Sequence, residues 1–107
     1  MRESGLPTPT WNPRLSDAGG RFIAVSDAWF DEVALAWEID SREWHLSPQD
    51  HDRTLDRRTA MTARGIWVVH TQPSKLKLNP AAVLADLRSN YAQAALRPRP
   101  PVHATPP

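Results

Sequence analysis

The sequence predicts a mixed α/β (α+β) domain, in which helices pack on a mixed four-stranded sheet. The first sign is residues 33–40 (VALAWEID), which alternate as a strand does. The second is two long segments that each open with a capping residue followed by proline, as helices do. The third is an apolar run between those segments, typical of an interior strand. The expected order is strand, strand, strand, helix, strand, helix.

Length and composition limit the chain to one domain. It has 107 residues, 11 of them proline, and a formal net charge of +1. Five of the prolines fall in the final RPRPPVHATPP, so we expect a domain over residues 1–96 and a disordered Pro-rich tail over residues 97–107. Residues 1–96 hold 11 Lys/Arg against 12 Asp/Glu, which excludes a domain held to nucleic acid by bulk charge.

The absence of cysteine excludes disulfides, thiolate zinc sites and a cysteine nucleophile, so any metal would need oxygen or imidazole ligands. The apolar stretches are too short for a membrane span, and the first ten residues lack the apolar core of a signal peptide. We therefore expect a cytoplasmic domain without membrane contact.

The first three strands follow from local patterns. Residues 10–15 carry two apolar side chains around Pro13, which cannot donate to a sheet, so this strand should lie at an edge. Residues 17–20 (DAGG) predict a turn, and residues 21–26 (RFIAVS) a second strand that completes a hairpin. Residues 33–40 form the third strand, with Glu38 and Asp40 on its small-residue face.

Two helices flank the last strand. Ser47-Pro48 predicts a helix start, and Gly65 is the expected C-cap of a helix that ends near Arg64. Residues 66–70 (IWVVH) then form an interior strand, parallel to residues 33–40 through a βαβ crossover. Asn79-Pro80 begins a second helix that ends before the tail.

Acidic residues concentrate in one segment, where six of the seven charged residues between positions 27 and 43 are Asp or Glu. Glu38 and Asp40 share one strand face, and pairing of the strands would bring Asp27 beside them. Three converging carboxylates repel one another unless a cation such as Mg²⁺ lies between them. The alternative interpretation is a solvated acidic edge.

Three further groups are candidates for chemistry. His45 is either a general acid, base or ligand, or a capping side chain, while His51, His70 and His103 have no convergent partners in the sequence. Trp44 is a candidate for contact with a ligand or base. The helix arginines, Arg53, Arg57 and Arg58, are either a solvated face, phosphate contacts, or a source of one arginine that reaches back to the acids.

The motifs taken together resemble a known family. The series GLPTPTWNPRL, a glycine turn, RFIAVSDAWF, VALAWEIDSREWHL, an Arg-bearing helix ending in RG, and IWVVH resembles the DUF559 domain. That domain belongs to the restriction-endonuclease-like (PD-(D/E)xK) superfamily and is related to the very-short-patch repair endonucleases. The family's strand-end Asp resembles Asp27, its Glu-x-Asp resembles Glu38-Ile39-Asp40, its His resembles His45, and its helix arginine resembles Arg57.

The resemblance implies a restriction-endonuclease-like core that performs Mg²⁺-dependent hydrolysis of DNA phosphodiesters. Asp27, Glu38 and Asp40 would hold the metal and act in catalysis, with His45 assisting proton transfer. The expected DNA contacts are Arg42, Trp44, Arg53 and Arg57.

The chain departs from the family pattern in ways that support an alternative. Endonucleases of this fold usually place Lys where Asp40 stands, although Asp is common there in this subgroup. Ser41 replaces a Gly, His70 replaces a strand-end Arg, and residues 1–5 would form at most the last turn of the family's N-terminal helix. The alternative is a catalytically inactive DNA- or protein-binding module of the same fold. It would be the C-terminal part of an abortive-infection antitoxin-like regulator and would act with a protein partner or as a homodimer.

Overall fold

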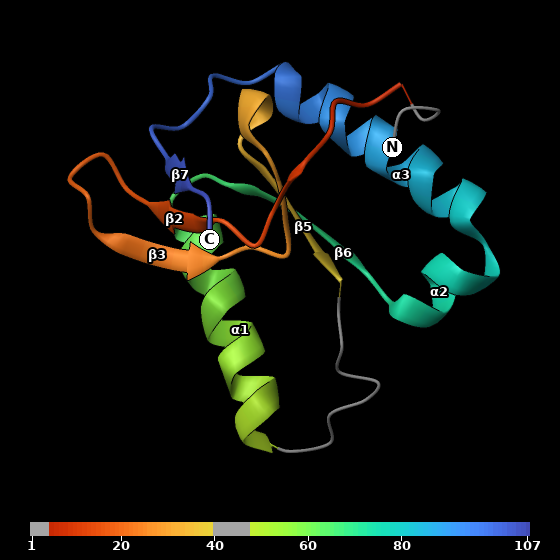
Figure 1. Cartoon of the computed structure of the whole chain (residues 1–107), viewed down its shortest axis with the longest axis horizontal. Helices are drawn as coiled ribbons and strands as arrows, with labels where there is room; N and C mark the ends of the chain where they lie inside the picture. Colours follow the sequence, from red (N-terminus) through yellow and green to blue (C-terminus); the bar gives the residue numbers. More distant parts are fainter. Residues whose placement is uncertain (1–4, 40–47) are drawn as a thin grey trace.

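A computed structural model describes residues 5–39 and 48–107, which form two sheets and three α-helices (Figure 1). The mixed α/β class and a four-stranded mixed sheet are confirmed. The strand predicted over residues 21–26 lies in the other sheet, however, and an unpredicted strand over Ala28–Phe30 belongs to the four-stranded one. None of the helices in these two ranges combines the length and the apolarity needed to cross a membrane.

The larger sheet has the strand order β1-β4-β5-β6. Its strands are β1 (Thr10–Trp11), β4 (Ala28–Phe30), β5 (Leu35–Ile39) and β6 (Trp67–Thr71). β4 runs antiparallel to β1 and β5, whereas β5 and β6 are parallel, as expected for a βαβ unit. β4 was not predicted, because its three residues are all buried and show no alternation.

The smaller sheet is antiparallel, with the order β3-β2-β7. It contains β2 (Arg14–Ser16), β3 (Phe22–Val25) and β7 (His103–Thr105). The predicted hairpin forms between β2 and β3, and Asp17 Oδ1 fixes its turn by accepting from the N–H groups of Gly19 and Arg21.

Two boundaries differ from the sequence-based expectation. The strand predicted over residues 10–15 is divided by Asn12, at φ 55°, and Pro13, so β1 and β2 enter different sheets. The tail predicted to be disordered supplies β7, which pairs with β2, and Val102 is only 3% exposed. Composition indicated disorder because the pairing partner lies almost 90 residues earlier in the chain.

The helices are α1 (Pro48–Ala63), α2 (Pro73–Leu78) and α3 (Pro80–Ala95). α1 ends as predicted, because Gly65 takes φ 80° directly after it. α3 begins as predicted, with the Asn79 side chain accepting a hydrogen bond from the N–H of Ala82. α2 was not predicted. Ser47, the predicted cap of α1, lies outside the described residues.

Two apolar clusters occupy opposite faces of β5, with α1 on one side of β5 and β6 and α3 on the other (Figure 1). The cluster on the α3 face includes Phe30, Leu35, Trp37, Val83 and Leu87. The cluster on the α1 face includes Leu15, Trp29, Ala34, Ala36 and Met61. The alternation predicted for β5 is confirmed, and Glu38 follows on from the small residues of the α1 face.

Candidate functional site

Asp27 and Glu38 lie side by side because β4 and β5 pair antiparallel. Ala28 is opposite Trp37 in that pairing, and the next positions in register are Asp27 and Glu38. The Asp27 N–H donates to Glu38 Oε2 at 2.9 Å, and the Ile39 N–H donates to Asp27 Oδ2, also at 2.9 Å. Each strand end therefore holds the carboxylate of the other, and two of the three predicted acids are adjacent.

Glu38 is almost fully enclosed, with 1% of its surface exposed. Its Oε2 also accepts a hydrogen bond from Ser26 Oγ at 3.2 Å. Its Oε1 accepts no hydrogen bond from the described residues, but lies 3.0 Å from Nε of Arg57 on α1. The Arg57 side chain is 36% exposed, so this ion pair joins a buried anion to a cation at the surface.

Burial raises the pKa of Glu38 above its ordinary value of 4.5. The charge of Asp27 raises this pKa further, whereas the Asp27 N–H, Arg57 and Ser26 lower it. The upward effects prevail, so the fold resists the negative charge at Glu38. A positive ion beside the two carboxylates would relieve that cost.

His70 extends the site on the neighbouring strand. The parallel pairing of β5 and β6 sets His70 opposite Glu38, and Arg58 Nη2 lies 3.1 Å from His70 Nδ1. His70, for which the sequence indicated no convergent partners, therefore lies beside Glu38 and Arg58. The sequence did predict that residues 33–40 pair with residues 66–70. Aligning these two strands residue by residue could have placed His70 opposite Glu38.

The remaining predicted residues are not brought together by the described part of the chain. Arg53 is exposed on α1, and Asp40, Arg42, Trp44 and His45 lie outside the described residues. Within residues 5–39 and 48–107, no three His, Asp or Glu side chains are arranged to hold a metal ion. Asp27 and Glu38 are thus a pair of candidate ligands rather than a complete set.

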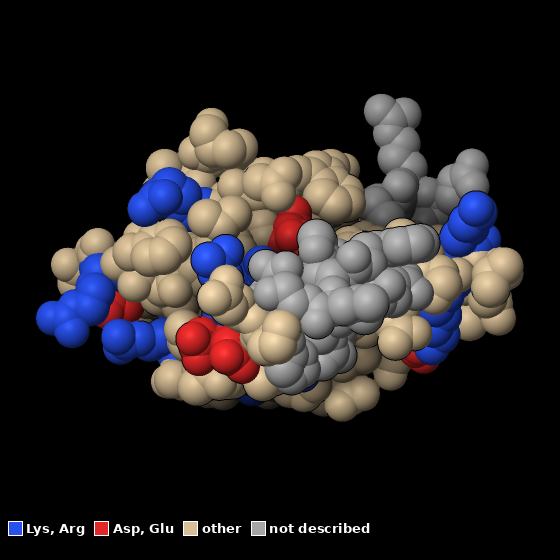
Figure 2. Space-filling view, turned by 90° about the horizontal axis from the view of Figure 1, so that it is seen from below, with Lys and Arg blue, Asp and Glu red and all other residues tan. Residues whose placement is uncertain are grey.

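The face of the molecule seen in Figure 2 is mixed in charge. On this face, the Lys and Arg side chains of the described residues are scattered and do not form a single basic patch. Any contact with DNA on this face would then depend on individual arginines, in keeping with the near-zero net charge.

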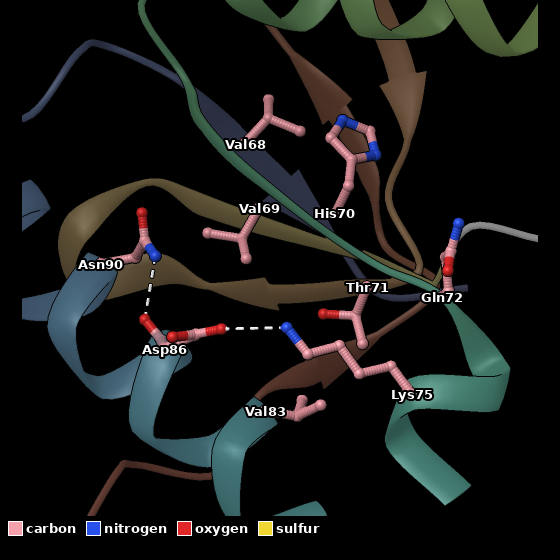
Figure 3. A pocket seen from close by; sticks show the side chains of 9 residues that line it. All are labelled: Val68, Val69, His70, Thr71, Gln72, Lys75, Val83, Asp86 and Asn90. Atoms are coloured by element: carbon pink, nitrogen blue, oxygen red, sulfur yellow. Dashed lines mark hydrogen bonds and ion pairs between the residues drawn. The ribbon is translucent and has the colours of Figure 1, made fainter. Parts of the chain in front are cut away.

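A pocket of about 490 Å³ lies between β6, α2 and α3 (Figure 3). Lys75 Nζ lies 3.4 Å from Asp86 Oδ2, and the Asn90 amide donates to the Asp86 carbonyl. Figure 3 shows His70 projecting from β6 away from these side chains. The charges of this pocket are already paired, so the carboxylate pair remains the stronger candidate site.

Comparisons with known proteins identify distant relatives only. No family model and no solved structure matches the chain. The uncharacterized proteins Rv2248 and MT2308, from two strains of Mycobacterium tuberculosis, are each 27% identical to it over 96 residues. That alignment covers 90% of this chain and 35% of each relative. The chain therefore spans about a third of the length of these relatives.

Proposed function

We propose that this chain is a restriction-endonuclease-like domain that hydrolyses DNA phosphodiester bonds with Mg²⁺ held at Asp27 and Glu38. The observation that carries the proposal is the pairing of these two carboxylates at adjoining strand ends, one of them buried with a raised pKa. A buried carboxyl whose pKa is raised by desolvation and by a neighbouring charge is a common feature of functional sites.

The residues fit a hard divalent cation. Glu38 Oε1 accepts no hydrogen bond from the described residues, although it is buried, and it already faces a cation. Carboxylate oxygens are the protein ligands that Mg²⁺ prefers. Asp40, two residues after Glu38 in the sequence, is the proposed third ligand.

The chain's own groups would orient this site before substrate arrives. Ser26 and the Asp27 N–H hold one oxygen of Glu38, and the Ile39 N–H holds one oxygen of Asp27, so neither carboxylate must be ordered on binding. A bound Mg²⁺ would supply polarisation of the phosphate and a lower pKa for an attacking water. His45 is the proposed proton donor or acceptor, and Arg42, Trp44 and Arg53 are proposed DNA contacts.

A plasmid-nicking assay tests this proposal. We expect the wild-type chain to nick supercoiled DNA in the presence of Mg²⁺ or Mn²⁺, and Glu38→Gln to reduce the rate on the order of 100-fold. Glu32→Gln makes the same chemical change at an exposed residue and should leave the rate intact. Nicking that persists equally in Glu38→Gln, or that is unaffected by EDTA, would overturn the proposed metal site.

A second candidate function is a non-catalytic DNA- or protein-binding module of the same fold. The observation that favours it is Arg57, whose guanidinium already balances the charge of Glu38. Such a module would serve a longer regulator of the abortive-infection antitoxin type. Retention of duplex DNA in low salt without cleavage in Mn²⁺ would support it, whereas absence of DNA binding would favour a protein partner or a homodimer.

A further inference from the structure

We infer that Arg57 is an internal counter-ion that competes with the divalent cation for Glu38, and that it moves to a DNA phosphate when substrate binds. The inference rests on the proposed function and assigns Arg57 a positioning role within it. It predicts that DNA and metal strengthen each other's binding.

Arg57 contacts the oxygen of Glu38 that a metal ion would need. Glu38 Oε2 is occupied by the Asp27 N–H and by Ser26 Oγ, which leaves Oε1, and Arg57 Nε lies 3.0 Å from it. A divalent cation on Oε1 would repel a guanidinium held at that distance. Metal and Arg57 therefore exclude one another at Glu38.

A phosphate group in a neighbouring groove would be a second partner for Arg57. A groove of about 380 Å³ lies between β3 and α1, and Arg57 lines it. The other lining residues are Phe22, Ile23, Ala24, Val25, Asp56 and Ala60, so Arg57 is the single cation among the described residues of its wall. Glu38 is buried and is not among these lining residues, so a phosphate group that enters this groove would meet Arg57 and not Glu38.

The Arg57 side chain can move from Glu38 to a phosphate without movement of α1. Arg58, the next residue on the helix, lies 3.1 Å from His70 on β6. Met61, one turn further along, is buried in the cluster on the α1 face. Both contacts anchor the helix while the partly exposed Arg57 side chain rotates away from Glu38.

The consequence is a reciprocal coupling between two ligands. DNA that takes Arg57 frees Glu38 for the metal, and metal at Glu38 releases Arg57 for the phosphate, so each ligand must raise the affinity of the other by the same factor. We expect that factor to be on the order of tenfold.

Calorimetric titration with Mn²⁺ at mildly alkaline pH tests the inference, because protons do not then compete for Glu38. The proteins are the wild-type chain, Arg57→Gln and Arg88→Gln, which removes the same charge from an exposed residue on α3. Each is titrated alone and with a short phosphorothioate duplex that is not cleaved. Arg57→Gln should bind Mn²⁺ about tenfold more tightly than the wild type, and Arg88→Gln should match the wild type.

The outcomes separate this inference from the proposed function. Mn²⁺ binding that is equal or weaker in Arg57→Gln would overturn the competition while leaving the metal site in place. Absence of Mn²⁺ binding in all three proteins would overturn the metal site itself. If Arg57→Gln does not fold, the wild-type chain decides: tighter Mn²⁺ binding with the duplex supports the coupling, and unchanged binding contradicts it.

Discussion

The two faces of β5 differ in what their side chains do. On the α3 face, Leu35 and Trp37 pack against Val83 and Leu87 in a cluster of large apolar residues. On the α1 face, Ala34 and Ala36 are followed by Glu38, a buried carboxylate. One five-residue strand thus carries apolar packing on one side and a candidate reactive group on the other.

The two faces of β5 contribute to the stability of the domain with opposite signs. Large apolar side chains buried on the α3 face contribute favourable free energy of folding. Desolvation of Glu38 on the α1 face opposes folding, and its hydrogen bonds and ion pair offset only part of that cost, because its pKa remains raised. A buried charged group that lowers the free energy of unfolding is common at functional sites, because it is retained for activity rather than for stability.

The largest expected effect is on the α3 face. Leu87 is 1% exposed, and Leu87→Ala should lower the free energy of unfolding by about 3 kcal/mol, because it removes buried methyl groups and leaves a cavity. Leu96→Ala makes the same change at an exposed residue and should cost less than about 0.5 kcal/mol. Urea denaturation measures both, and equal effects would contradict the assignment of the core.

A smaller effect of opposite sign is expected on the α1 face. Glu38→Gln keeps an acceptor for the Asp27 N–H but removes the buried charge, so it should raise the free energy of unfolding at neutral pH, by less than Leu87→Ala lowers it. Arg57 is exposed enough to turn away from the new amide.

The pH dependence of this gain follows from the raised pKa of Glu38. The fold favours the protonated carboxyl, so the contribution of Glu38 to stability is fully present below its ordinary pKa of 4.5 and is lost as the pH rises through the raised value. The advantage of Glu38→Gln should therefore vanish on acidification. A variant that is less stable than the wild type at neutral pH would show instead that Glu38 stabilises the fold as an anion.

Features with local signals were predictable from the sequence. Gly65 and Asn79 mark the end of α1 and the start of α3 because capping needs only a few neighbouring residues. The alternation of β5 predicted which of its residues face each cluster. Asp27 and Glu38 were expected together because residues 21–26 were predicted to pair with residues 33–40, whereas the structure brings them together through β4. One arginine reaching back to the acids was among the interpretations considered.

Features that depend on distant pairing were not predictable. Trp29 is buried in β4, and neither β4 nor its place between β1 and β5 follows from a three-residue apolar stretch. β7 exists because β2 offers it an edge, which the proline content of the tail does not indicate. His70 gains Glu38 and Arg58 as neighbours only through the register of β5 with β6 and the position of α1.

The most direct test of the central claim, a divalent cation at Asp27 and Glu38, is the melting temperature of the chain in increasing Mn²⁺. We expect the wild-type melting temperature to rise by several degrees at millimolar Mn²⁺, since a ligand that binds only the folded state stabilises it. Asp27→Asn keeps an oxygen for the Ile39 N–H but loses the charge, and should abolish the rise. Asp86→Asn, at an exposed acid on α3, should retain it. No response of the wild type to Mn²⁺, or an undiminished response in Asp27→Asn, would contradict the claim.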